Sequence, residues 1–494
     1  MTVRAESFNR PSVWYLAGGA FLWAIAMRIF IAPGQIENDI YEQANQATGQ
    51  TPMSDWHPPI MSALWGALAQ LMGTMDVLLS INVLLMATGI WLLCWTILLR
   101  TDRPGLACLP LAVLVTPWTL SQLVLLWKDT TMAAALVFGC GAVFLAAECR
   151  KRQGRVNVAP IGLMVLAVIS IAFAVLVRKN AVAAVVPVVL YAAAVWSPRQ
   201  AVLGRLHMTG SSVARRLRTA AGSAGRFAVR SFAVVAAVGC AGVGMNLWVE
   251  STHTIEQTHQ IDQIILDDVM FSVPSEELHK SGASPELITR LDTARRHCLD
   301  IGWISDAYWR CWGRGLDGEA YQPVEHAGEL KQLWKQHVLT HPFRWFDYRL
   351  ENYSRYLTTT QLVTLREHGR GAEIGMPFTP NPVSETVRGV VFAAEPTAVF
   401  KAWFWLALST LMCLAAIVFR PQFGREIIAL STSALVYMLA YIPVIPAFHF
   451  RYTYWPAVAV SLACVLAIAG SAHGNTRGQR RFFIAERKRR RTIR

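Results

Sequence analysis

Long apolar blocks recur along this chain and constrain its fold more than any other feature. Each is close to the ~20 residues that an α-helix needs to cross a bilayer. The blocks cover residues 13–32, 76–99, 106–126, 130–147, 157–177, 181–197, 231–250, 401–419, 426–445 and 452–472. Charged residues make up only 16% of the chain, against about 25% in soluble domains. The sequence predicts an all-α polytopic membrane protein with about ten transmembrane helices.

The basic residues give these blocks an orientation. The net charge is +14, and the cations cluster in regions 148–155, 198–230 and 473–494, beside the apolar blocks. Basic loops beside spans stay in the cytoplasm, so we interpret the charge as a topology signal and exclude a nucleic-acid partner. Both termini are then cytoplasmic. We expect a multi-pass protein of the inner or plasma membrane, in contact with membrane lipids.

This topology divides the chain into four parts. Residues 1–250 form an N-terminal membrane module whose first external loop is 33–58, and residues 251–400 form an extracytoplasmic, mainly α-helical domain. Residues 401–472 form the C-terminal spans, and residues 473–494 form a basic cytoplasmic tail. A further apolar segment, 60–73, is short for a span and fits a helix at the membrane interface.

The external domain contains two cysteines and a group of aromatic residues. An oxidising compartment permits a disulfide between Cys298 and Cys311, and two free thiols are the alternative. The aromatic residues are Trp303, Tyr308, Trp309 and Trp312. Packing of a small core is the favoured interpretation of this group, and a saccharide-binding surface is the other.

Four polar clusters fall at the external ends of the spans. They are Glu37, Asp39, Glu42, Asp55 and His57; Lys128 and Asp129; Arg178, Lys179 and Asn180; and His449, Arg451 and Tyr452. Each has an ordinary explanation, such as a cation reaching the lipid headgroups, an N-cap at Asp129, or a rigid turn at His57. External cations nevertheless oppose the usual charge bias. Together, the clusters combine carboxylates that can accept a proton with cations that bind phosphate.

Other classes of site are absent from the sequence. It has no P-loop, no glycine-rich dinucleotide motif after a strand, and no zinc-type spacing of cysteine and histidine. Nucleotide sugars are not found outside the cell. A lipid-linked phosphate donor meets that constraint, and its apolar tail explains the many spans.

The chain resembles the GT-C superfamily of integral-membrane glycosyltransferases, which use polyprenyl-phosphate-linked sugars. The residues that carry the resemblance are Asp39, Tyr41 and Gln43; the run from Asp55 to Pro59; Lys128-Asp129; Arg178-Lys179-Asn180; and Arg451-Tyr452. They cover the first ~200 residues and the last spans. Region 251–400 matches no part of the family pattern, and the acidic pair common in the first loop of the family is absent.

The resemblance implies roles for individual residues. Asp39 would be the catalytic base, with Asp55 as the alternative and His57 beside them. Lys128, Arg178, Lys179 and Arg451 would hold the donor phosphate. Glu37, Tyr41, Gln43, Asp129, Asn180, His449 and Tyr452 would support these groups. Some family members use Mg²⁺ or Mn²⁺, and Asp39, Asp55 and His57 would be its ligands here.

We therefore expect an inverting glycosyltransferase that moves a sugar from a polyprenyl-phosphate-linked donor to an extracytoplasmic glycan, lipid or protein. The alternatives are a flippase or transporter of lipid-linked glycans, and a polysaccharide polymerase or ligase. A transporter places ionisable residues near the bilayer midplane and has internal repeats. In this sequence the charges lie at span ends, which favours the transferase.

Overall fold

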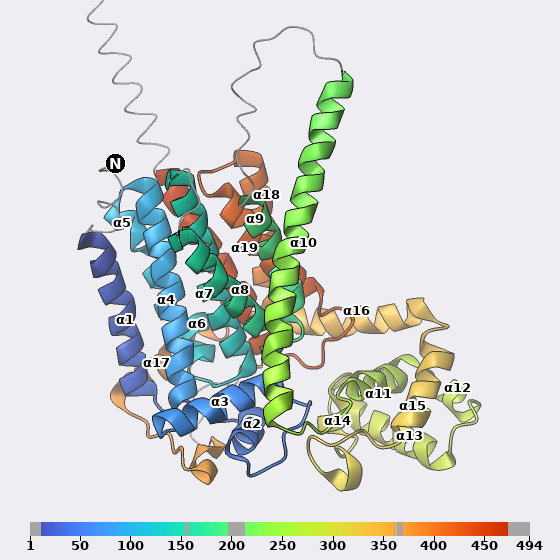
Figure 1. Cartoon of the computed structure of the whole chain (residues 1–494). Helices are drawn as coiled ribbons and strands as arrows, with labels where there is room; N and C mark the ends of the chain where they lie inside the picture. Colours follow the sequence, from blue (N-terminus) through green and yellow to red (C-terminus); the bar gives the residue numbers. More distant parts are fainter. Residues whose placement is uncertain (1–10, 154–157, 196–212, 360, 363–368, 473–494) are drawn as a thin grey trace, which may run out of the picture.

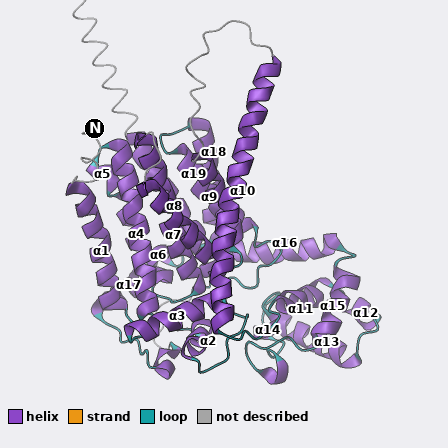
Figure 2. Ribbon diagram, viewed as in Figure 1, coloured by secondary structure: helices purple, strands orange, loops and turns teal. Residues whose placement is uncertain are grey.

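The computed structural model describes residues 11–153, 158–195, 213–359, 361–362 and 369–472 (Figure 1). Regular structure in these residues is helical, and strand-like pairing is limited to three isolated bridges (Figure 2). The predicted basic loop 198–230 lies partly outside the described residues, and the basic tail 473–494 lies wholly outside them. The helices form a long bundle, with a smaller helical domain beside one end of it.

Seven helices in the described part of the chain are long and apolar enough to cross a membrane. They are α1 (Pro11–Ile31), α4 (Val77–Thr101), α7 (Lys128–Gln153), α8 (Val158–Val177), α10 (Val213–Thr252), α18 (Ala402–Phe419) and the last helix, within Phe450–Ala472. Helix α7 is almost entirely enclosed by its neighbours. A Cβ on Gly89 of α4 would lie 2.6 Å from the backbone N of Phe138, so a glycine lets α4 and α7 pack closely. The multi-pass membrane architecture expected from the sequence is confirmed at this level.

Three predicted spans take a different form. Block 106–126 becomes α5 (Pro104–Ala107), η2 (Leu109–Val115) and α6 (Pro117–Leu123). The segment Pro104–Val115, which contains α5 and η2, meets α6 at a bend of 53°. Proline lacks a backbone N–H and favours a new helix start, which accounts for the break at Pro117. Helices α9 (Ala181–Val195) and α19 (Gly424–Leu439) are 15 and 16 residues long. Within the described residues the bundle thus has seven full-length spans, or eight with the bent pair, where about ten were expected.

The loop after α1 folds into two helices at one end of the bundle. Helix α2 (Asn38–Thr48) begins with Asp39 in its first turn, where a carboxylate is favoured by the helix dipole. It ends at Gly49, which is left-handed with φ 74°. Helix α3 (Pro59–Met72) is the short apolar helix predicted for the interface. Gly66 of α3 packs against the backbone of Ala47, so the two helices lie in direct contact.

A second domain, named here the α11–α16 domain, has a hydrophobic core of its own. Its elements are α11 (Ile261–Ser272), α12 (Ser275–His279), α13 (Pro285–Asp300), α14 (Ala307–Arg310), η4 (Leu316–Gly318), α15 (Ala327–Leu333), η5 (Trp334–Val338) and α16 (Pro342–Thr358). Cys298 and Cys311 form a disulfide with their Cα atoms 5.5 Å apart. Tyr308 and Trp312 are buried in the core, which agrees with the packing interpretation of the aromatic group.

The chain after this domain returns to the bundle. Its elements are η6 (Arg370–Ile374), α17 (Pro382–Ala394), η7 (Ala398–Phe400) and, before the last helix, η8 (Phe450–Thr453). Helix α17 packs against α6 and α1. Although it belongs to the region 251–400 expected as one domain, it therefore lies with the membrane module.

A buried ionic cluster, named here the Arg100 cluster, joins α4, α7, α9 and α19. The Arg100 guanidinium donates to Glu148 at 2.9 Å and to Glu426 at 2.7 Å. The Tyr191 hydroxyl donates to Glu426 at 2.8 Å. All four side chains are largely shielded from solvent, so their charges depend on one another.

Candidate functional site

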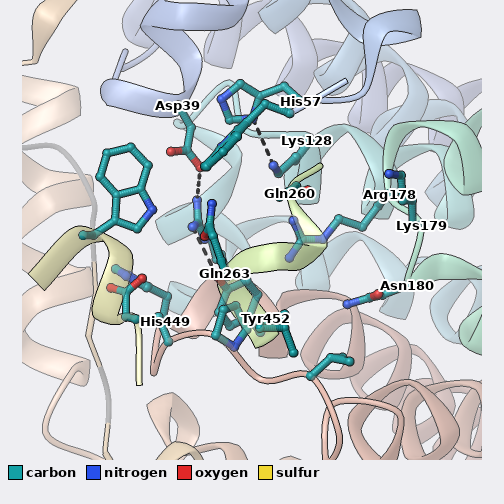
Figure 3. Close-up of a pocket in the computed structure, with 18 of the residues that line it drawn as sticks. Asp39, His57, Lys128, Arg178, Lys179, Asn180, Gln260, Gln263, His449 and Tyr452 are labelled. Carbon is teal, nitrogen blue, oxygen red and sulfur yellow. Dashed lines mark hydrogen bonds and ion pairs between the residues drawn. The ribbon is translucent and has the colours of Figure 1, made fainter. Parts of the chain in front are cut away.

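A cavity of about 700 Å³ opens where α2, the start of α7, the α8–α9 turn and the segment before the last helix meet the α11–α16 domain (Figure 3). All four predicted polar clusters contribute side chains to it. The predicted residues that line it are Glu37, Asp39, Asp55, His57, Lys128, Arg178, Lys179, Asn180, His449, Arg451 and Tyr452. Asp39 and Arg451, which are 412 positions apart in the sequence, thus share one space.

Backbone contacts explain how the first loop reaches the start of α7. The Gln35 N–H donates to the carbonyl of Val124 at 2.8 Å, and Gln35 forms a parallel bridge with Leu125. Lys128 begins α7 three residues later. Backbone hydrogen bonding therefore holds the loop that carries Asp39 beside the start of α7.

The carboxylate of Asp39 forms an ion pair with Arg451. Nη1 of Arg451 donates to Oδ2 of Asp39 at 2.8 Å. The guanidinium also lies 4.4 Å from the ring centroid of Trp127 and donates to the Tyr452 hydroxyl at 3.2 Å. Burial opposes the ionisation of Asp39, but the groups around the carboxylate, Arg451 first among them and Lys128 as well, together outweigh it and lower the pKa of Asp39 well below its usual range. Asp39 is therefore an anion at neutral pH.

The imidazole of His57 is bonded to Lys128. The Lys128 Nζ lies 3.1 Å from Nδ1 of His57, and both side chains are buried. Burial and the nearby Lys128 charge hold the pKa of His57 well below its usual value, so the ring is neutral. An ammonium group only donates, so Nδ1 accepts and the ring proton is assigned to Nε2. In this arrangement His57 is a hydrogen-bond donor and not a base.

Arg178 is held by an acid at the start of α7. Its Nε lies 3.1 Å from Oδ1 of Asp129, and its Nη2 donates to the Tyr441 hydroxyl at 3.3 Å. The guanidinium also lies 5.2 Å from the ring centroid of Tyr452. Asp129 does not line the cavity, and its role is to orient the cation that does. Figure 3 shows Arg178, Lys179 and Asn180 on the same side of the cavity.

The carboxylate of Asp55 has a different environment from that of Asp39. The backbone N–H and the hydroxyl of Thr258 both donate to its Oδ1 at 2.6 Å. The Asp55 N–H also donates to the carbonyl of Glu256 at 3.0 Å. Asp55 lines the cavity, but its contacts tie the first loop to the chain that enters the α11–α16 domain. This geometry favours Asp39 over Asp55 as a proton acceptor.

Two residues expected to support the site lie away from the cavity. The Tyr41 ring lies under the guanidinium of Arg370, 3.5 Å from its Cζ. Gln43 is fully buried in α2. Both belong to the packing of the first loop, and neither lines the cavity.

Sequence reasoning missed the side chains that the α11–α16 domain and the segment leading into it add. They are His259, Gln260, Gln263, Asp306, Trp309, Arg310 and Arg314. Asp306 pairs with Arg310 at 3.3 Å, and burial raises the pKa of Asp306 to about 7. Trp309 belonged to the aromatic group noted in the sequence. The other residues lack a pattern that distinguishes them from ordinary loop residues.

The three residues named as metal ligands do not converge. Asp39 pairs with Arg451, Asp55 with Thr258 and His57 with Lys128. Over the part of the chain that the structure describes, no group of three or more His, Cys, Asp or Glu side chains is arranged to hold a metal ion. These contacts do not fit a Mg²⁺ or Mn²⁺ site.

No protein-family model, curated protein or solved structure matches the chain. The functional assignment therefore depends on the cavity and its chemistry.

Proposed function

We propose that this protein is a membrane glycosyltransferase that moves a sugar from a polyprenyl-phosphate-linked donor to an extracytoplasmic acceptor, a glycan, lipid or protein. The observation that carries the proposal is the convergence of an ionised carboxylate, Asp39, with cations from three other segments in one cavity at the end of the bundle. A glycosyl transfer from a phosphate needs these two kinds of group within reach of one another.

The cations supply the phosphate site. Lys128 is buried and Arg178 and Arg451 are partly buried. They are held by His57, Asp129 and Asp39, so their positions require little rearrangement when a ligand binds. Lys179 is exposed beside them. Arginine and lysine bind phosphate strongly, and fixed cations stabilise the negative charge that develops on the leaving phosphate. Because the cavity adjoins apolar spans, the prenyl chain of the donor can remain in the bilayer.

Asp39 accepts the proton of the acceptor. The acceptor hydroxyl oxygen attacks the anomeric carbon, the bond from that carbon to the phosphate oxygen breaks, and the phosphate leaves with the electron pair. The hydroxyl proton passes to the Asp39 carboxylate. Attack opposite the leaving group inverts the anomeric configuration.

The ion pair between Asp39 and Arg451 gives donor binding a second effect. While Arg451 is bonded to Asp39, the low pKa of Asp39 makes it a weak base. A donor phosphate that takes over Arg451 removes this charge from the carboxylate and raises its pKa. Asp39 thereby becomes a stronger base when the donor is present, which limits proton abstraction in its absence.

A vesicle experiment tests the assignment against a flippase. Purified protein is reconstituted into vesicles with a polyprenyl-phosphate sugar labelled in the sugar, and cell-envelope extracts are supplied as acceptor. The proposal predicts label in a water-soluble or new lipid product together with release of unlabelled polyprenyl phosphate. Movement of the label between leaflets without bond cleavage would contradict it and favour the flippase. Chain growth of a lipid-linked glycan would favour a polymerase.

A further inference from the structure

The cavity has a second wall to which the transfer step gives no role. It is formed by the α11–α16 domain and the segment leading into it, and it includes Gln260, Gln263, Asp306, Trp309, Arg310 and Arg314. Figure 3 shows Gln260 and Gln263 in the same space as Asp39 and Lys128. A transferase has two substrates, and the cations of the bundle account for only one of them.

An indole of fixed orientation belongs to this wall. The ring of Trp309 contacts the rings of Tyr308 at 5.1 Å and Tyr321 at 5.3 Å, and that of Trp56 at 6.3 Å between centroids. Edge-to-face contacts of this kind are favourable and directional. Trp309 is only partly buried and lines the cavity, while its neighbour Tyr308 is in the core. A sugar ring has an apolar face of C–H groups that packs against such an indole.

A side-chain amide that lines the same cavity has an unpaired donor among the described residues. Nε2 of Gln263 is buried and has no hydrogen-bond acceptor among the described residues. A buried amide donor without a partner destabilises the protein, because it has lost its hydrogen bonds to water and gained none in return. A ligand hydroxyl that enters the cavity would remove this cost, and carbohydrates carry several hydroxyls on each ring.

The wall also carries excess positive charge. Arg310 pairs with Asp306 and lies 4.1 Å from the ring centroid of Trp303. Arg314 is exposed, its Cζ lies 5.7 Å from the centroid of Trp309, and within the described ranges it has no acidic partner. Two guanidiniums therefore face one carboxylate. A free guanidinium binds carboxylate and phosphate groups in a bidentate manner.

We propose that this wall is the acceptor subsite and that it binds a saccharide carrying negatively charged groups. Trp309 packs against a sugar ring, Gln263 bonds to a hydroxyl, and Arg314 pairs with the acidic group. The role of this wall as an acceptor subsite rests on the proposed transferase function. The binding of an acidic saccharide at this wall can be measured without any donor or transfer.

Calorimetric titration of the full-length protein in detergent tests the inference. The probe is an oligogalacturonate, compared with its methyl ester, which has the same sugars without the charge, and with a polyglutamate peptide, which has the charge without the sugars. We expect the oligogalacturonate to bind at least about fivefold more tightly than either comparison ligand. Comparable binding of the methyl ester would exclude recognition of the charge, and comparable binding of the peptide would exclude recognition of the sugar. No binding by any probe would overturn the proposal.

One substitution and a matched control locate the binding. Arg314→Gln removes the charge at a position with φ 71°, and glutamine meets the same backbone constraint as arginine, so folding is retained. The control is Arg296→Gln, an exposed arginine of α13 that does not line the cavity. We expect roughly fivefold weaker oligogalacturonate binding for Arg314→Gln and no change for the control. Equal affinities for the two variants would contradict this wall as the site.

The transferase proposal and the acceptor-subsite proposal can be tested independently of one another. If transfer occurs in vesicles but Arg314→Gln leaves acceptor KM unchanged, the subsite is wrong and the transferase stands. If the acidic saccharide binds through Arg314 but no transfer is found, the subsite stands and the transferase is wrong.

Discussion

The described part of the bundle has two ionic clusters: the Arg100 cluster and the charged residues that line the cavity, named here the cavity cluster. Both consist of arginine or lysine with acidic residues, but they differ in how many of their polar atoms have a hydrogen-bond partner. Helix α7 carries Lys128 and Asp129 at its first turn and Glu148 near its last turn, about 30 Å apart at 1.5 Å per residue. In the Arg100 cluster, every nitrogen of the guanidinium has a partner: Glu148, Glu426 and the carbonyl of Gln422. At the cavity, Nε of Arg451 and Nε2 of His57 are buried without one among the described residues.

This difference separates a structural ion network from a binding site. Buried charge is costly unless it is fully paired, and the Arg100 cluster meets that condition with protein groups alone. The cavity cluster leaves polar atoms unpaired next to about 700 Å³ of space, which a charged ligand can fill. The contrast predicts that substitutions in the Arg100 cluster change mainly the stability of the protein, and that substitutions at the cavity change mainly its transfer activity.

The largest loss of stability is expected from Arg100→Gln. The change leaves Glu148 and Glu426 buried without their shared cation, at a cost of about 3–5 kcal/mol in the free energy of unfolding. Thermal unfolding in detergent measures it. Arg296→Gln is a control, because Arg296 is exposed and donates to a neutral acceptor, the carbonyl of Asp292, at 3.3 Å. Equal losses of unfolding midpoint for the two variants would contradict a structural role for the Arg100 cluster.

Arg451→Gln is expected to have the reverse effect. Loss of one preorganised cation at a developing phosphate charge lowers transfer about 100- to 1000-fold. The unfolding midpoint should change much less than in Arg100→Gln, since the Asp39 side chain is 26% exposed and can be solvated from the cavity. Arg344→Gln, which breaks an Arg–Glu pair of 2.7 Å outside the cavity, serves as the control for activity. Comparable activities of the two variants would argue against a phosphate site at Arg451.

The smallest effect concerns the pH dependence of stability. Burial raises the pKa of Asp306 to about 7 from 3.8, and that of Asp267 to about 7 as well. Between about pH 4 and 7 these two carboxyl groups bind protons in the folded state that they do not bind in the unfolded state, so their contribution to stability falls as pH rises through this window and levels off above it. Asp306→Asn removes one of the two groups, and asparagine tolerates its left-handed backbone at φ 60°.

We expect the unfolding midpoint of the unmodified protein to fall relative to that of Asp306→Asn between about pH 5 and pH 8, because the other titrating groups, including His57, Glu42 and Asp268, are common to both proteins and cancel in the comparison. Arg310 faces Asp306 and keeps its charge over this range, so it does not contribute to the slope. Melting curves of the variant and the parent at several pH values measure the effect. An unchanged slope would show that Asp306 is ionised throughout.

The long apolar blocks were predicted from the sequence because twenty-residue runs leave few alternatives to a spanning helix. The break before Pro117 follows from the missing backbone N–H of proline, which mean hydropathy does not record. Asp39, Lys128, Arg178 and Arg451 were predicted from the sequence because their clusters share the external side of the membrane and because external cations oppose the usual charge bias.

The rest of the cavity depends on contacts between distant segments. The role of Asp55 becomes visible only with Thr258, 203 residues later in the chain. Gln263 and Arg314 come from a region with no diagnostic periodicity or motif, and tertiary structure brings them to the cavity. The sequence therefore identified the bundle wall of the site but gave no signal for the wall of the α11–α16 domain.

The central claim is that Asp39 accepts a proton in sugar transfer, and the comparison of Asp39→Asn with Asp55→Asn tests it most directly. Both changes replace a carboxylate of the same loop with an amide, and in Asp55→Asn the amide oxygen can still accept from Thr258. With a saturating polyprenyl-phosphate sugar, we predict at least about 100-fold slower transfer for Asp39→Asn and a change of less than about threefold for Asp55→Asn. Transfer by Asp39→Asn at the rate of the unmodified protein would contradict the account.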